Sequence, residues 1–175
     1  MTHPLKARLG DKPILLMDDQ FYTVGDYQLR LADVGVVVEH VATLDEALAR
    51  IERTPNGYGL ALLDLNMPEP KAPALLGYAS ELHLSPTSFN HGRCLGLHLW
   101  NQRATLELPY CYLSALPHFL GSAAGEFGDR DCVADFILDK ATLLPSQLPD
   151  ALVKVLEKWD ALHRANGNTR SGGQS

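Results

Sequence analysis

Short apolar runs alternate with longer amphipathic stretches along most of the chain. Each run is only a few residues long and is bounded by polar residues, proline or glycine, which is typical of strands that are buried on both faces. The runs that predict strands are 13–17, 36–41, 58–64, 108–115 and 133–138.

The stretches between these runs predict helices. Thr43 and Glu46 have the three-residue spacing of a capping box, so a helix is expected to begin at residue 44. Gly35 is a stop signal for the helix before it. The apolar positions of that earlier helix fall roughly on one face: Phe21, Val24, Leu29 and Leu31. Further helical stretches are expected at 73–84, 92–104, 117–128 and within 146–165.

Five strands that alternate with helices predict an α/β protein with a parallel sheet covered on both faces. In such open sheets, ligands bind beyond the carboxyl ends of the strands. The predicted strands lead at those ends into three carboxylates, a hydroxyl and an ammonium group. These groups belong to Asp18, Asp19, Asp64, Ser114 and Lys140.

Clustered carboxylates do not all remain ionised without a cation between them. Because the ligands are oxygens only, Mg²⁺ is the expected ion. A carboxylate beside Mg²⁺, with a lysine and a hydroxyl in reach, is suited to accepting a phosphoryl group. Asp64 would attack in line, Lys140 would neutralise phosphoryl oxygens, and Ser114 would donate a hydrogen bond to one of them.

Four motifs at these positions resemble those of response-regulator receiver domains, and they occur in the same order. The motifs are ILLMDDQ, LALLDLNMP, LPYCYLSA and DFILDK, and the resemblance covers about residues 12–164. It implies a flavodoxin-like fold, a doubly wound five-stranded parallel sheet of order 2-1-3-4-5. It also implies an insertion at 69–91, between the third strand and the following helix.

The resemblance implies roles for individual residues. Asp64 would be the phospho-acceptor, Ser114 the switch hydroxyl and Lys140 the phosphate-binding lysine. The residues implied for Mg²⁺ are Asp18, Asp19, Asp64 and the backbone carbonyl of Asn66.

The sequence departs from the receiver pattern near Lys140. Ala141 follows this lysine where the family usually has proline. The family's switch aromatic normally stands three residues before the lysine, but Ile137 occupies that position and Phe136 lies one residue earlier. Either the loop holds an extra residue or the aromatic switch is absent.

The insertion is the other departure. Gly92 follows Asp64 by 28 residues, much later than the corresponding glycine of the family. A long insertion has a modest entropic cost, so 69–91 is either a tolerated surface loop or a lid or docking surface beside the acceptor.

Charge and cysteine content narrow the function classes. Fifteen Lys and Arg against 21 Asp and Glu give a net charge of −6, which argues against nucleic acid as a partner. Cys94, Cys111 and Cys132 have no CxxC spacing, so free thiols in a reducing cytoplasm are expected. No apolar run is long enough to span a membrane. A soluble cytoplasmic protein is therefore expected.

The remaining aromatic and histidine residues favour packing over chemistry. Tyr110 and Tyr112 alternate within an apolar strand, so core positions are expected for both. His91 and His98 are seven residues apart and can share a helical face, but a packed or solvated histidine is more common than a ligand pair.

These observations predict a stand-alone receiver with an N-terminal extension at 1–11, a receiver domain at 12–164 and a disordered tail at 165–175. It would take a phosphoryl group from a histidine kinase or a histidine phosphotransfer protein and switch a surface for a downstream protein. Its own catalysis would be limited to self-phosphorylation and slow autodephosphorylation. The sequence leaves open whether it forms a homodimer.

Two other functions remain open. A receiver-like scaffold that binds a partner constitutively is favoured by Ala141 and by the insertion, whereas the intact acidic pair argues against it. A phosphatase of the haloacid dehalogenase type also uses an aspartate at a strand end with Mg²⁺. It requires a second aspartate two residues after the nucleophile, where this chain has Asn66.

Overall fold

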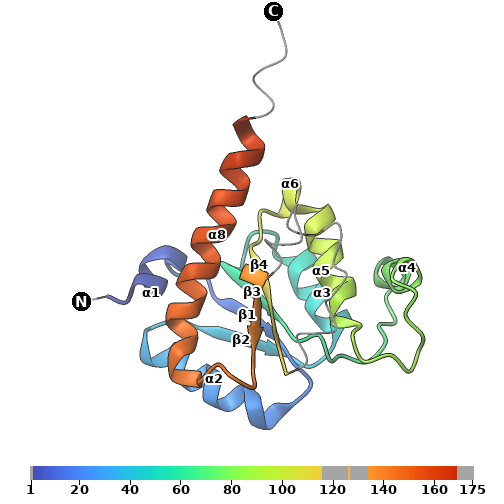
Figure 1. The fold of residues 1–175 in the computed structure, drawn as a ribbon, viewed down its shortest axis with the longest axis horizontal. Helices are drawn as coiled ribbons and strands as arrows, with labels where there is room; N and C mark the ends of the chain where they lie inside the picture. Colours follow the sequence, from blue (N-terminus) through green and yellow to red (C-terminus); the bar gives the residue numbers. More distant parts are fainter. Residues whose placement is uncertain (1, 116–125, 127–133, 169–175) are drawn as a thin grey trace, which may run out of the picture.

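Five strands alternate with helices in the computed structural model, which describes residues 2–115, Glu126 and residues 134–168 (Figure 1). The strands are β1 (Ile14–Met17), β2 (Val38–Val41), β3 (Leu60–Leu63), β4 (Tyr110–Ser114) and β5 (Ile137–Asp139). The α-helices are α1 (Pro4–Leu9), α2 (Phe21–Asp33), α3 (Leu44–Arg53), α4 (Pro73–Glu81), α5 (Gly92–Asn101), α6 (Arg103–Leu106) and α8 (Leu148–Asn168). Two 3₁₀ turns, η2 (Ala134–Phe136) and η3 (Pro145–Gln147), flank β5.

All the strands run parallel in the order β2-β1-β3-β4-β5, which confirms the predicted fold class. The register brings their carboxyl ends to one level. Met17 pairs with Val41 on one side and with Leu63 on the other, and Leu63 pairs with Tyr112. The residues that follow these pairs therefore leave the sheet at the same edge.

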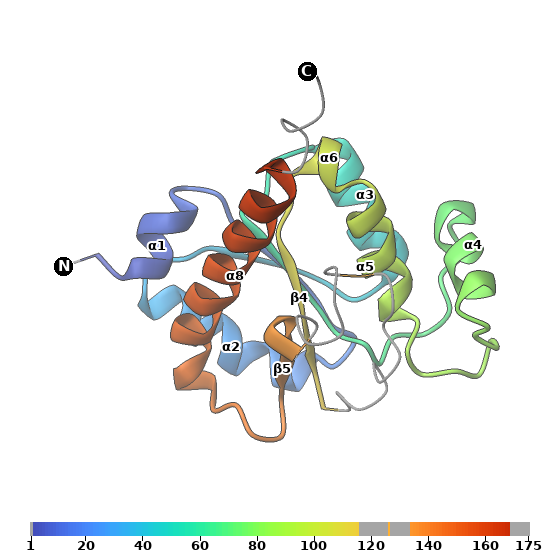
Figure 2. The same ribbon diagram turned by 45° about the horizontal axis from the view of Figure 1, so that its top comes forward.

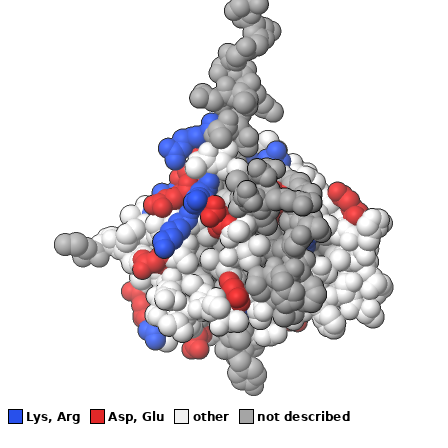
Figure 3. Space-filling view, in the orientation of Figure 1, with Lys and Arg blue, Asp and Glu red and all other residues white. Residues whose placement is uncertain are grey.

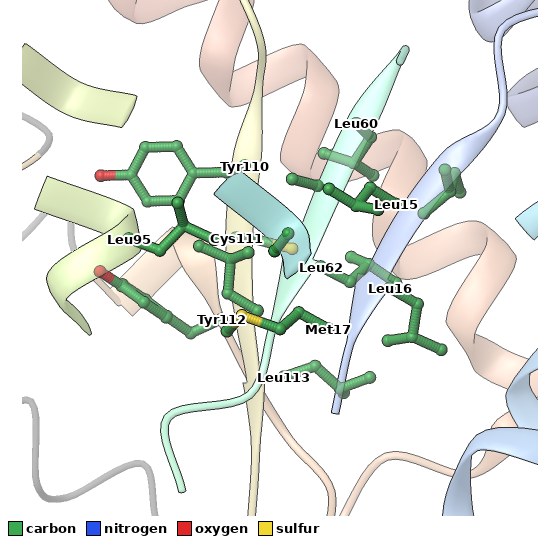
Figure 4. Close-up of a cluster of buried hydrophobic side chains, with 14 of the residues drawn as sticks. Leu15, Leu16, Met17, Leu60, Leu62, Leu95, Tyr110, Cys111, Tyr112 and Leu113 are labelled. Carbon is green, nitrogen blue, oxygen red and sulfur yellow. The ribbon is translucent and has the colours of Figure 1, made fainter. Parts of the chain in front are cut away.

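Helices cover both faces of the sheet (Figures 1 and 2). Helices α1, α2 and α8 pack together on one face, and α3 and α5 lie on the other, with α4 outside α5. Every residue of β1, β3 and β4 is buried, because helices cover both faces of these strands. Figure 4 shows leucines of β1 and β3 and the tyrosines of β4 within one cluster of buried side chains.

Helices α1 and α8, near the two ends of the described chain, contact each other. Leu5 and Leu9 of α1 are buried, and Arg8 pairs with Asp160 of α8, so the N-terminal segment is a helix packed on the core. Helix α8 runs to Asn168, past the predicted boundary at 164. The rest of the predicted tail lies outside the described residues. So does the helix predicted at 117–128, apart from Glu126, which the structure describes.

Helix α2 forms as predicted, but its buried face includes a different residue. Leu29 is 56% exposed, whereas Tyr27 is 5% exposed. Val24, Tyr27 and Leu31 follow helical spacing and form the buried stripe. The prediction was wrong at Leu29 because its position lies too far around the helix from this stripe. The side chain of Phe21 lies outside the described residues.

Strand β5 is shorter than the predicted run 133–138. Phe136 belongs to the 3₁₀ turn η2, is buried, and packs edge-to-face on Trp159 of α8 with 6.0 Å between ring centroids. The strand therefore begins only at Ile137, which is half-buried. The aromatic residue near Lys140 is thus a core residue rather than a surface one.

The insertion is an ordered structure docked on the domain. The carboxylate of Asp45, in the first turn of α3, accepts hydrogen bonds from the backbone amides of Lys71 (3.0 Å) and Ala72 (2.6 Å). Helix α4 then packs along α5, where the Tyr78 and His98 rings meet edge-to-face at 5.9 Å. On the face shown in Figure 3, charged side chains of both signs gather over α1 and α8, and the surface over α4 carries few charges.

Candidate functional site

Three carboxylates meet at the carboxyl edge of the sheet. Oxygen atoms of Asp18, Asp19 and Asp64 lie within 4.8 Å of one another. Asp18 and Asp64 are fully buried, and Asp19 is exposed. The aligned register of β1 and β3 produces this cluster, and the Asp64 amide donates to the Met17 carbonyl at 2.9 Å.

One oxygen of each buried carboxylate is held by its own loop. Asp18 Oδ1 accepts a hydrogen bond from the amide of Gln20 at 2.8 Å, and Asp64 Oδ1 accepts one from the amide of Asn66 at 3.1 Å. These short side-chain-to-backbone bonds are typical of aspartates that leave a strand into a turn. They fix both carboxylates and leave each Oδ2 for another partner.

That partner is Lys140, which follows β5. Its Nζ donates to Asp18 Oδ2 at 2.6 Å and to Asp64 Oδ2 at 2.8 Å. Burial by itself lowers the pKa of Lys140, but the charge of Asp64 and the hydrogen bonds to both aspartates outweigh it, so the pKa is raised. The ammonium group is therefore charged at neutral pH.

The charges of the cluster do not balance. Within the described part of the chain, Lys140 is the only cation paired with these three carboxylates, so two negative charges remain. The pKa of Asp19 is raised, first by burial and then by the charges of Asp64 and Asp18. A divalent cation would cancel this excess, and an oxygen-only ligand set suits Mg²⁺. The residues present therefore fit the ion that the sequence predicts.

Ser114 lies at the same edge. It is fully buried at the end of β4 and pairs with Asp139 of β5. Its carbonyl accepts a hydrogen bond from the backbone amide of Lys140 at 2.9 Å. The sheet thus brings together the predicted site residues, and Asn66 joins them through its amide bond to Asp64.

The fold, compared with solved structures, matches receiver domains. A CheY-like response regulator receiver domain protein from Methanospirillum hungatei JF-1 is 23% identical, with a TM-score of 0.55 over 88% of this chain and 98% of that one. A receiver domain protein from Clostridium thermocellum is 15% identical, with a TM-score of 0.55 over 86% and 98%. The response regulator PhyR from Brucella abortus is 13% identical, with a TM-score of 0.59 over 94% of this chain and 56% of that one.

This chain has the fold of a response-regulator receiver domain. No family model and no curated protein matches its sequence, so the likeness is one of fold. None of the helices in the described ranges has the length and apolar character needed to cross a membrane.

Gly92 shows how this receiver fold accommodates its insertion. A Cβ atom at Gly92 would lie 1.8 Å from the carbonyl oxygen of Asp64 and 2.9 Å from the Cα atom of Leu65. The Gly92 amide also donates to the Leu65 carbonyl at 3.2 Å. Only glycine allows α5 to begin this close to the loop that follows β3. After the insertion, Gly92 therefore packs against the backbone of Asp64 and Leu65, although it follows Asp64 by 28 residues.

Ala141 also has a structural reason. Its backbone amide donates to Asp139 Oδ1 at 2.8 Å, a hydrogen bond that proline cannot make. The amide of Leu143 donates to the Asp139 carbonyl at 2.8 Å and closes the turn. In this receiver fold the loop after Lys140 is thus held by hydrogen bonds to Asp139.

Two sets of contacts near the site have no signal in the sequence. His40 Nε2 donates to the Asp18 carbonyl at 2.7 Å and supports the loop after β1. A buried group that we call the Glu126 cluster lies between β4 and α5. Its members are Arg93, Tyr110, Tyr112 and Glu126.

Both carboxylate oxygens of Glu126 accept hydrogen bonds within the cluster. Arg93 Nε donates to Glu126 Oε2 at 3.1 Å, and the hydroxyls of Tyr110 and Tyr112 donate to Oε1 at 2.8 and 2.6 Å. Glu126 is 1% exposed and Arg93 8%. Burial, together with neighbouring negative charge, raises the pKa of both tyrosines well above the usual value. No local sequence signal indicates these contacts, because charged residues are normally read as surface positions.

His91 and His98 both contribute to the packing around α5. His98 lies against Tyr78, and burial lowers its pKa. His91 is fully buried at the start of α5, and its ring nitrogens have no hydrogen-bond partner among the described residues.

Proposed function

We propose that this chain is a phosphoryl-accepting receiver that uses Asp64 as its acceptor and Mg²⁺ as its cofactor. The observation that carries this proposal is the carboxylate cluster with Lys140 bound between two of its members. The cluster joins a nucleophilic carboxylate, ligands for a divalent cation and a cationic group for phosphoryl oxygens at one sheet edge.

The chemistry follows from these contacts. An Asp64 oxygen attacks the phosphorus of a phosphohistidine, the phosphorus–nitrogen bond breaks, and an acyl phosphate forms on Asp64 while the imidazole departs. Mg²⁺ bound by Asp18, Asp19, Asp64 and the Asn66 carbonyl would supply charge neutralisation at the phosphoryl oxygens. Lys140 exchanges its bonds to the carboxylates for a bond to a phosphoryl oxygen.

The new phosphoryl group then biases the local structure. Lys140 and Ser114 share a backbone hydrogen bond, so a shift of one side chain toward the phosphoryl group is transmitted to the ends of β4 and β5. The partners of this switch would be a histidine kinase or a histidine phosphotransfer protein on the donor side and a protein target on the output side.

The test uses a small acyl phosphate as donor, with Mg²⁺ and with a chelator. We expect the wild-type chain to gain one phosphoryl group by intact mass, only when Mg²⁺ is present. Asp64→Asn should gain none. Asp139→Asn is the matched control, since Asp139 is a carboxylate at the same edge whose amide-accepting oxygen asparagine retains. Equal phosphorylation of Asp64→Asn and wild type would overturn the assignment.

A constitutive scaffold is the second candidate, and the insertion favours it, because α4 packs on α5 and the backbone before α4 is held by Asp45. Pull-down of partners with and without the phosphodonor separates the two functions. A scaffold should retain its partner equally in both conditions, and it should do so in Asp64→Asn.

A further inference from the structure

The Glu126 cluster lies against both flanks of the proposed acceptor. On one flank, Arg93 directly follows Gly92, which touches the Asp64 carbonyl and donates its amide to Leu65. On the other flank, Tyr112 pairs across the sheet with Leu63, the residue before Asp64. The bonds to Glu126 thus connect α5 to β4 around the Asp64 peptide groups.

The distance between α5 and β4 is set by this contact. Figure 4 shows the rings of Tyr110 and Tyr112 leaving β4 on the same side, with Leu95 of α5 beside them. A Cβ atom at position 96 of α5 would lie 1.9 Å from the Tyr112 hydroxyl, so the helix approaches the cluster this closely only because residue 96 is glycine.

We propose that Arg93 and Glu126 are positioning residues for the Asp64 pocket. They hold the first turn of α5 on the loop that follows the acceptor. This inference rests on the proposed function for its consequence in metal binding and phosphorylation, but the positioning itself is a property of the unmodified chain.

The energetics distinguish positioning from stabilisation. Burying an ion pair costs desolvation, and apolar residues of similar size often replace such a pair without loss of stability. Apolar contacts are not directional, whereas the bonds to Glu126 fix where α5 begins relative to Asp64. The cluster is therefore expected to set geometry at the pocket more than it sets global stability.

The experiment replaces the whole cluster by apolar residues in the full chain: Arg93→Met, Tyr110→Phe, Tyr112→Phe and Glu126→Leu together. Leu9→Ala is the control, because it removes core contacts in α1, which packs beside Gly59 at the amino end of β3. The measurements are the Tm, amide hydrogen exchange at 64–67 and 91–94 without metal or donor, and the dissociation constant for Mg²⁺.

We expect the apolar variant to exchange its amides at 64–67 and 91–94 about tenfold faster and to bind Mg²⁺ about tenfold more weakly, the scale of lost outer-shell support. The control should lower the Tm and leave both quantities unchanged. Wild-type exchange and affinity in the folded apolar variant would overturn the proposal, and so would equal changes in Leu9→Ala.

Tyr112→Phe alone serves if the fourfold variant does not fold, since it removes one hydroxyl and keeps the ion pair. Its amide exchange should be faster and its Mg²⁺ binding weaker, by smaller factors than in the fourfold variant. Unchanged amide exchange in Tyr112→Phe would contradict the inference. Failure of the wild-type chain to bind Mg²⁺ would refute the proposed function, while amide exchange would still decide whether the cluster positions α5.

Discussion

Two acidic groups lie near the loop that follows β3, and they differ in the balance between negative charge and its partners. At the sheet edge, the ammonium group of Lys140 binds two of three carboxylates and is the one cation paired with them in the described part of the chain. In the Glu126 cluster, one carboxylate receives a guanidinium group and two hydroxyls. The first group carries excess negative charge and is suited to binding a cation. In the second group both oxygens of Glu126 accept hydrogen bonds, so this group is suited to fixing the position of α5 relative to β4.

Burial of an acidic residue does not by itself indicate a ligand site. What separates the two groups is the balance between acceptors and donors. A balanced group gains nothing from an added cation, whereas an unbalanced one is stabilised by it. The following changes test that difference.

The largest loss of stability is expected from Glu126→Leu. It leaves the buried guanidinium of Arg93 and two buried hydroxyls without their acceptor, so the free energy of unfolding should fall by about 3–5 kcal/mol. Urea denaturation measures it. Added Mg²⁺ should stabilise Glu126→Leu no more than it stabilises the wild-type chain, and a larger gain in the variant would contradict the separation of the two groups.

Lys140→Met should lower the free energy of unfolding by about 2–3 kcal/mol in chelator, because Asp18 and Asp64 lose their counter-charge. Here Mg²⁺ should restore stability, by about 2.7 kcal/mol at a hundred times its dissociation constant. Thermal melts with and without Mg²⁺ measure this. A variant equally unstable in both conditions would show that the carboxylates do not hold the ion.

Gly92→Ala tests the contact that joins the two groups. The added methyl group collides with the Asp64 carbonyl, so stability should fall by about 1–3 kcal/mol and phosphorylation should slow. Gly77→Ala is the control, because nothing lies within 4 Å of a Cβ atom at Gly77 in α4. It should raise stability by about 0.5–1 kcal/mol. Similar outcomes for the two variants would show that the close approach at Gly92 is not required.

The smallest effect on stability is expected from Asp19→Asn. Partial burial, and then the charges of Asp64 and Asp18, disfavour ionised Asp19, so removing its charge should raise the metal-free Tm by about 1–3 °C. The same change should weaken Mg²⁺ binding. Asp26→Asn, an exposed carboxylate on α2 outside the cluster, should change neither. A lower Tm for Asp19→Asn would contradict the like-charge repulsion.

The helices and strands could be predicted from the sequence because their apolar periodicity is local. The errors arose where side-chain packing decided the outcome. Tyr27 was buried in place of Leu29, and Phe136 turned into the core against Trp159, which delayed the start of β5. The docking of the insertion through Asp45 was likewise invisible, since that residue and Lys71 are far apart in the chain.

The sequence by itself determined the carboxylate cluster, because parallel strands bring their carboxyl ends to one edge, and Asp18, Asp64 and Lys140 follow such ends. Only the tertiary structure decided the Glu126 cluster. A charged residue becomes a core residue only when donors from distant segments surround it, here Arg93 of α5 and two tyrosines of β4. The cost of burying its charge is offset by those long-range bonds, which leave no pattern along the chain.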